Sequence, residues 1–147
     1  MLVNPGFENG TTGWIQSSGG YPLIDNSKPH TGIYGVWGGG YNSATDTINQ
    51  TVTVPTNGKL SYWWRVESFD STSTAHDYLR VQLYDATTGG FITTLRTWSN
   101  VNTRNVWAQD TLSLATYAGR AVRVHFAVST DSSVTSSFYI DDVSVGT

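Results

Sequence analysis

The sequence predicts an all-β protein, a two-sheet antiparallel β-sandwich whose termini are adjacent. Short segments alternate apolar and polar residues with a period of two, and turn residues such as Gly, Pro, Asn and Asp separate them. Long amphipathic helices are disfavoured, because the chain has only two lysines and two glutamates. With 147 residues, the chain fits one domain, residues 1–147, with a sizeable core.

Five short segments in the first half of the chain have strand character, and turns containing Pro or Gly separate most of them. They are residues 2–4, 13–16, 33–37, 46–54 and 59–67. In the last segment, alternate residues form an apolar set that we expect to face the core. These residues are Leu60, Tyr62, Trp64 and Val66.

The second half of the chain repeats this pattern in five further segments. They are residues 77–85, 91–98, 106–114, 121–129 and 137–145. Thr-Thr-Gly-Gly at positions 87–90 predicts a hairpin turn. The expected core residues of these strands include Leu79, Val81, Leu83, Val122, Val124, Phe126 and Val128. About nine to eleven strands result, as is typical of a two-sheet sandwich.

The last predicted strand contains two adjacent carboxylates, Asp141 and Asp142. Strand interiors seldom hold acidic residues without a compensating partner, so we expect a cation there. Glu8, near the other terminus, is the candidate for the second half of such a site. Alternation places Asp142 with Ile140 and Asp141 with Val143, so it leaves open which one faces the cation. Alternatively, Glu8 caps a turn and both aspartates are solvated.

Composition excludes several classes of function. The net charge of −3 is too small, and of the wrong sign, for a nucleic-acid binder. The absence of cysteine removes disulfides and thiolate chemistry. No apolar run approaches a membrane span, and no signal peptide is recognisable, so we expect no membrane partner and a mature module cut from a larger protein.

No arrangement of residues predicts catalysis, so we expect that the chain is not an enzyme. The three histidines, His30, His76 and His125, form no pair at metal-ligand spacing, and no nucleophile motif is present. Most aspartates lie at strand ends or in loops, where Asp is ordinary turn chemistry.

Six stretches together resemble a known group of domains. They are Asn-Pro-Gly-Phe-Glu at 4–8, Trp14, His-Thr-Gly-Ile-Tyr-Gly at 30–35, Leu-Ser-Tyr-Trp-Trp-Arg at 60–65, Tyr-Ala-Gly at 117–119, and Phe-Tyr-Ile-Asp-Asp-Val at 138–143. The chain resembles the jelly-roll accessory domains of secreted bacterial peptidases and glycoside hydrolases, in the galactose-binding-like and carbohydrate-binding-module superfamily, with a more distant likeness to MAM adhesion domains. The resemblance implies a secreted, monomeric, non-catalytic module beside another domain of a larger protein.

The resemblance also implies a structural calcium ion between the two ends of the chain. Its ligands would be Glu8 and one of Asp141 or Asp142, together with backbone carbonyls from the stretch 28–31, including Lys28 and His30. The chemistry agrees, since calcium takes six to eight oxygen ligands in irregular geometry.

Outward-pointing residues on the central strands suggest a carbohydrate ligand. The candidates are Trp63, Arg65, Arg80, Gln82, Tyr84, Arg123 and His125. If their strands are neighbours, they form one face of aromatic rings and hydrogen-bonding groups, which is a mixture that recognises sugars. Alternatively, they pack under a loop or against another domain, or a one-residue slip buries Trp63. The chain would then be an adhesion or spacer module without a sugar ligand.

Three further features have simpler interpretations. Trp14, Trp64 and Trp107 are expected to anchor the core or loops, whereas Trp37 and Trp98 stay undecided. The stretch 38–41 is interpreted as a mobile turn, since no helix follows it to form a phosphate site. The loop 68–76, with Asp70 and Asp77 nearby, could frame a ligand site or a second ion, but we interpret it as a flexible polar connection.

Overall fold

The computed structural model describes residues 1–147 as ten strands in two five-stranded antiparallel sheets, which confirms the predicted fold class. Sheet A has the order β1 (Ile15–Ser17), β4 (Thr45–Thr53), β9 (Ala121–Ser129), β6 (Tyr78–Asp85) and β7 (Phe91–Ser99). Sheet B has the order β2 (Ile24–Asp25), β3 (Gly35–Gly39), β10 (Ser136–Gly146), β5 (Lys59–Ser68) and β8 (Ala108–Ser113). A short 3-10 helix, η1 (Ala115–Tyr117), precedes β9. No helix is long and apolar enough to cross a membrane.

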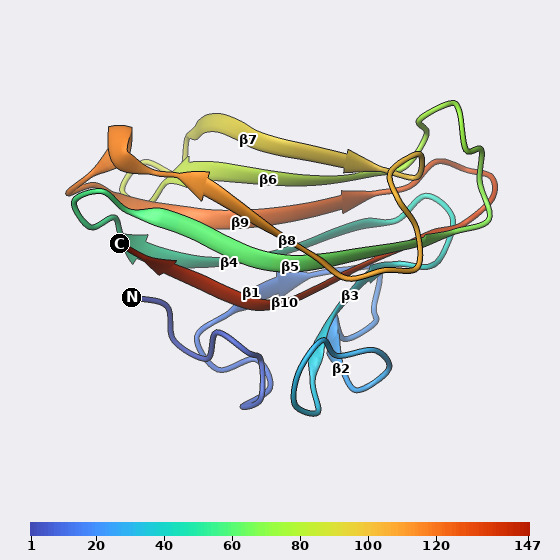
Figure 1. The fold of residues 1–147 in the computed structure, drawn as a ribbon, viewed down its shortest axis with the longest axis horizontal. Helices are drawn as coiled ribbons and strands as arrows, with labels where there is room; N and C mark the ends of the chain where they lie inside the picture. The colour runs from blue at the N-terminus through green and yellow to red at the C-terminus, as the bar shows by residue number, and fades with distance from the viewer.

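The two sheets form two layers with the core between them (Figure 1). Along the second half of the chain, most connections pass from one sheet to the other, so the neighbours in each sheet are distant in sequence. The predicted alternation is confirmed in the long strands: Leu60, Tyr62 and Val66 of β5 are buried completely, as are Leu79, Val81 and Leu83 of β6. Trp14 and Trp64 are also buried in the core, as predicted.

Two predictions near the N-terminus are wrong. Residues 2–4 form no strand, because the side chain of Asn4 binds the carbonyls of Gly10 and Thr12 and stabilises a series of turns. β3 begins at Gly35 instead of Ile33, because the N–H of Ile33 donates to the carboxylate of Glu8 instead of to a neighbouring strand. β2 was not predicted, since a two-residue strand is too short to show a period.

A β-bulge interrupts β10 between Asp141 and Ser144, where the pairing with β5 changes register. Asp142 has a positive φ of 50° at this point. The extra residue reverses the alternation, so Ile140 before the bulge and Val143 after it both belong to the core. Strict alternation would have placed these two residues on opposite faces.

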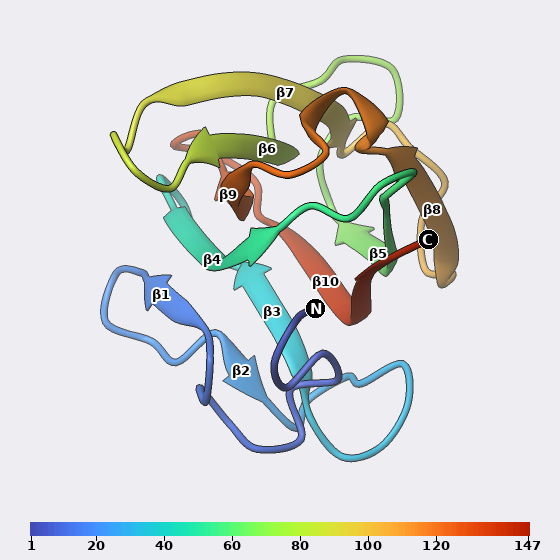
Figure 2. The ribbon, with the colours of Figure 1, turned by 90° about the vertical axis from the view of Figure 1, so that its left-hand side faces the viewer.

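The N-terminal segment lies beside β10, as the prediction of adjacent termini requires (Figure 2). The carbonyl of Pro5 accepts a hydrogen bond of 3.0 Å from the N–H of Val143, just after the bulge. The N–H of Val3 donates to the side chain of Gln50 in β4, so the segment also contacts the other sheet.

Candidate binding sites

Asp141 lies in β10 directly before the bulge and faces the loop that precedes β3. The Asp141 side chain is completely buried, and its Oδ2 accepts hydrogen bonds from the N–H groups of His30 (2.9 Å) and Thr31 (3.1 Å). Its Oδ1 accepts from the N–H of Asp142 at 2.8 Å. The carboxylate therefore fixes the His30–Thr31 turn to the central strand of sheet B.

Asp142 and Glu8 contact the same loop. Asp142 Oδ2 lies 2.7 Å from Nδ1 of His30, and the hydroxyl of Thr31 donates to Asp142 at 2.8 Å. The Glu8 carboxylate accepts from the N–H groups of Ile33 and Tyr34 at 3.0–3.1 Å. We call Glu8, Asp141 and Asp142 the terminal carboxylate cluster.

Gly32 lets Glu8 approach this loop. Its φ is +68°, and a Cβ at this position would overlap the Glu8 carboxylate. A residue with a side chain would therefore be strained in backbone conformation and would also displace Glu8.

The chemistry of this cluster suits a hard cation. No lysine or arginine forms an ion pair with any of the three carboxylates, and His30 is the sole basic partner. Burial raises the pKa of Asp141 to about 6, because its charge is poorly compensated. Its three N–H donors occupy three of about four acceptor positions, which leaves capacity for a metal. None of Glu8, Asp141 and Asp142, however, belongs to a set of three ligand atoms within 4.8 Å of one another.

The seven outward residues predicted to bind a ligand divide between the two sheets. Five of them lie on β6 and β9, which are neighbours in sheet A. Trp63 and Arg65 lie on β5 in sheet B, so they cannot share a face with the others. Trp63 stacks on the ring of His30 with 4.1 Å between centroids, and Arg65 donates to Glu67 at 2.8 Å. Trp63 therefore contacts the loop before β3 directly, and Arg65 binds Glu67, which also pairs with Lys28 of that loop.

The remaining five residues lie together on the outer side of sheet A. We call this set the sheet A face: Arg80, Gln82, Tyr84, Arg123 and His125. Gln82 pairs with His125 across β6 and β9, and Tyr84 pairs with Arg123. The rings of Tyr84 and His125 lie 4.7 Å apart. Burial and the nearby Arg123 lower the pKa of His125, which favours the neutral imidazole.

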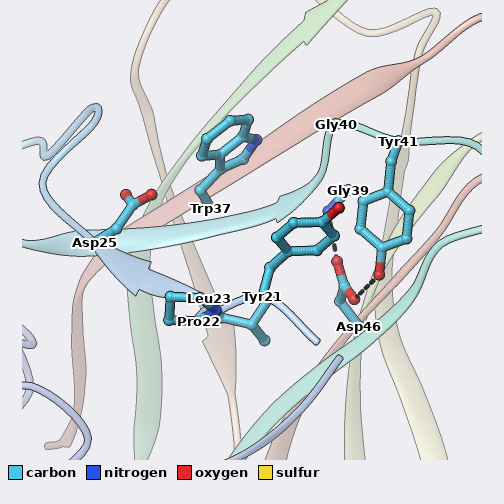
Figure 3. Close-up of a pocket in the computed structure, with 9 residues that line it drawn as sticks. All are labelled: Tyr21, Pro22, Leu23, Asp25, Trp37, Gly39, Gly40, Tyr41 and Asp46. Atoms are coloured by element: carbon cyan, nitrogen blue, oxygen red, sulfur yellow. Dashed lines mark hydrogen bonds between the residues drawn. The ribbon is translucent and has the colours of Figure 1, made fainter. Parts of the chain in front are cut away.

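A hollow that the sequence did not predict lies beside β3. Its volume is about 320 Å³, and its walls include Tyr21, Trp37 and Tyr41 together with two acidic residues, Asp25 and Asp46 (Figure 3). We call it the aromatic pocket. Tyr21 is 64% exposed, so its ring is open to solvent at the rim.

Hydrogen bonds fix the walls of the aromatic pocket. The buried carboxylate of Asp46 accepts from the N–H of Gly39 at 2.8 Å and from the hydroxyl of Tyr41 at 2.6 Å. The indole N–H of Trp37 donates to the hydroxyl of Ser137 at 3.0 Å. The stretch 38–41 is therefore not a turn throughout, as the sequence suggested: Gly38 and Gly39 end β3, and Gly39 is held in the pocket wall. The sequence signal for the aromatic pocket was weak, because it consisted only of aromatic residues on either side of a glycine run and had no regular period.

Solved structures share this fold. The module TmCBM61, solved in complex with beta-1,4-galactotriose, matches with a TM-score of 0.70 and 19% identity over 99% of this chain and 96% of that chain. The K3 adhesin domain of Lys-gingipain from Porphyromonas gingivalis W83 matches with a TM-score of 0.69 and 16% identity over 99% and 98% of the two chains. No protein-family model and no curated protein matches the sequence.

A third match is part of a larger enzyme. The CBM22-1–GH10 modules of Xyn10B from Clostridium thermocellum, complexed with xylohexaose, match with a TM-score of 0.63 and 19% identity over 98% of this chain and 28% of that chain. At these identities the likeness establishes the fold. The fold is that of jelly-roll modules among which are carbohydrate-binding modules and adhesin domains, which confirms the resemblance.

The raised pKa of Asp141 predicts a specific pH dependence of stability in the calcium-free protein. The pKa of Asp141 is about 6 in the folded state against an ordinary value of 3.8, so this contribution favours folding below about pH 4. It is lost as the pH rises through 6, by about 3 kcal/mol in total. The free energy of unfolding in urea should be measured for wild type and Asp141→Asn between pH 4 and pH 6. The value for wild type minus the value for the variant should fall as the pH rises.

Asp110 provides a matched control for this measurement. Burial opposes ionisation of Asp110, but hydrogen bonds from Arg96 and Tyr62 outweigh it and lower the pKa. Its contribution should therefore be present above about pH 4 and be lost as the pH falls below that value. The difference between wild type and Asp110→Asn should then fall as the pH is lowered, which is opposite in sign to the result expected for Asp141→Asn. A flat difference between wild type and Asp141→Asn would contradict the assignment.

Proposed function

We propose that the chain is a non-catalytic carbohydrate-binding module. The observation that carries this proposal is the aromatic pocket. Its volume of about 320 Å³ lies in the range of small-ligand sites. Aromatic faces such as those of Tyr21 and Trp37 stack on the apolar face of a pyranose, and carboxylates such as Asp25 accept hydrogen bonds from its hydroxyls. The pocket therefore suits one sugar unit of an oligosaccharide.

The sheet A face is a second surface for the same function. Its Arg and Gln side chains offer hydrogen-bond donors, and Tyr84 offers an aromatic ring. It is broad enough to follow a chain of sugar units, since its members span two neighbouring strands. In the proposal, the aromatic pocket is the primary contact and the sheet A face is the alternative location.

The structural neighbours favour an oligosaccharide over other ligands. The complexes of TmCBM61 with beta-1,4-galactotriose and of the Xyn10B modules with xylohexaose support a sugar polymer as the class of ligand. The gingipain adhesin domains support the alternative, an adhesion or spacer module. In either case we propose a secreted, monomeric domain that adjoins another domain of a larger protein.

A glycan screen followed by calorimetry tests the sugar proposal. With the best oligosaccharide from the screen, Tyr21→Ala should weaken binding about tenfold, which corresponds to about 1.4 kcal/mol, because a stacking ring is removed. Tyr21 is exposed at the rim, so this variant should keep the wild-type melting temperature.

Tyr84→Ala is the matched control, since it removes the same side chain from the sheet A face. If Tyr84→Ala abolishes binding and Tyr21→Ala leaves it intact, the sugar binds to the sheet A face. If the folded, calcium-loaded protein binds no glycan in the screen, the adhesion or spacer module is the better interpretation.

We also propose that the terminal carboxylate cluster holds a structural calcium ion. Glu8, Asp141 and Asp142 would supply carboxylate oxygens, and the stretch 28–31, with Lys28 and His30, would supply backbone carbonyls. Calcium accepts such a mixed oxygen set, and its charge would compensate the buried carboxylate of Asp141. The ion would join the N-terminal segment, the loop before β3 and the bulge in β10.

Calcium should therefore raise the melting temperature, and chelation should lower it. At a free calcium concentration of 100 times Kd, the expected gain is about 2.7 kcal/mol. Glu8→Gln should reduce this gain. Asp85→Asn is the control, because Asp85 pairs with Arg120, away from the cluster and from the stretch 28–31. An unchanged melting curve after exhaustive chelation, with no calcium found by elemental analysis, would refute the site.

A further inference from the structure

A second group of ligating side chains lies where the β5–β6 and β9–β10 loops meet. Asp70 and His76 belong to the first loop, and Asp131 belongs to the second. One ligand atom from each lies within 4.8 Å of the others, and no other set of three such residues in the protein does so. Asp70 Oδ1 is 3.0 Å from Nδ1 of His76. We call these three residues the Asp70 cluster.

One oxygen in this cluster lacks a partner. The Asp70 side chain is only 7% exposed, and its Oδ2 is the sole buried side-chain N or O atom in the protein without a hydrogen bond. A buried carboxylate oxygen without a donor is costly, and native structures usually provide a donor, a water or a metal. The Asp70 cluster is therefore incomplete as a purely hydrogen-bonded arrangement.

Asp70 is itself compensated, because the Ser71 N–H and His76 lower its pKa, but the neighbouring Asp77 is not. The fully buried Asp77 accepts from the N–H of Asp131 at 2.9 Å and from the hydroxyl of Ser136. Burial raises the pKa of Asp77, and the charges of Asp131 and Asp70 add to this effect. The nearby Arg104 does not neutralise these carboxylates, since its N–H groups donate to backbone carbonyls.

Those contacts of Arg104 hold the loop in a fixed shape. The buried side chain of Asn100 completes this support: its amide donates to the carbonyls of Ser71 and Thr74, and its Oδ1 accepts from the N–H of His76 and of Asp77. The loop that the sequence suggested to be a flexible connection is thus anchored on both sides of its tip. Asp70 and His76 are presented on a supported segment, as a metal site requires.

We propose that the Asp70 cluster binds a divalent cation of the zinc class. Two carboxylates and one imidazole are three ligands that suit zinc, with a fourth position open to water. Calcium is disfavoured here, because it prefers oxygen ligands throughout. This site is separate from the terminal carboxylate cluster and does not depend on sugar binding.

To hold zinc, the three ligand atoms, which lie within 4.8 Å of one another, must come closer together. Zinc holds N and O ligands at about 2.0–2.2 Å, so its ligand atoms lie about 3.3 Å apart. The Asp70–His76 separation of 3.0 Å is already near this value. The His76 side chain is 39% exposed, so it can rotate and can leave the fourth position open to solvent.

Calorimetric titration of the chelator-treated full chain with zinc chloride tests the proposal, with calcium in excess to saturate the terminal carboxylate cluster. The expected result is one zinc per chain. His76→Ala should weaken zinc binding by more than about 100-fold, since even the loss of an outer contact typically costs 10–100-fold. In the wild-type protein, NMR signals of the His76 ring should shift on titration, which provides a readout that needs no variant.

His125→Ala and His30→Ala are the matched controls, and both should retain wild-type zinc affinity. His30 matters most, because its contact with Asp142 makes it the rival nitrogen ligand. Asp70→Asn should also weaken zinc binding. This variant should still show a cooperative melting transition in the absence of metal, as expected for a folded protein. The proposal is overturned if no zinc binds, if His76→Ala binds as wild type does, or if only His30→Ala loses the metal.

Discussion

Asp141 and the bulge that follows it in β10 are the features on which the other parts of the structure depend. β10 is the central strand of sheet B, between β3 and β5, and Asp141, which pairs with Trp63 directly before the bulge, faces the loop before β3. Its carboxylate fixes His30 and Thr31, while the N–H of Val143 binds the carbonyl of Pro5. Asp141 and the bulge after it thus together position the N-terminal segment and the loop before β3. The cost is a buried carboxylate without a lysine or arginine partner.

β3 connects this cluster to the aromatic pocket. Its first residue, Gly35, lies against Asp141, where an added Cβ would be 3.5 Å from Oδ2. Two residues later, Trp37 forms a wall of the pocket, and Gly39 donates to Asp46. Because β3 is only five residues long, whatever orders the loop before it also fixes Trp37. If both proposals hold, stabilisation by calcium and binding of sugar would depend on the same short strand.

The sequence predicted the long strands well because their alternation is strict, as in β5, β6 and β9. It did not predict the bulge, although a signal was present: the apolar positions change parity between Ile140 and Val143. Alternation also cannot assign a strand to a sheet, since both sheets share the same core, and this is why Trp63 was grouped with the sheet A face. The aromatic pocket was missed because Tyr21 and Tyr41 lie in loops, where no period exists.

The β9–β10 loop connects the Asp70 cluster to the same pocket. The carbonyl of Asp131 accepts from the N–H of Ser43 at 2.7 Å, and the hydroxyl of Thr130 donates to the carbonyl of Tyr41 at 2.7 Å. Tyr41 in turn binds Asp46 in the pocket wall. A cation that restrains Asp131 would therefore also restrain the segment that carries Tyr41. Ordering this segment before a sugar arrives lowers the entropic cost of binding, so metal and sugar would bind with positive coupling despite occupying different sites.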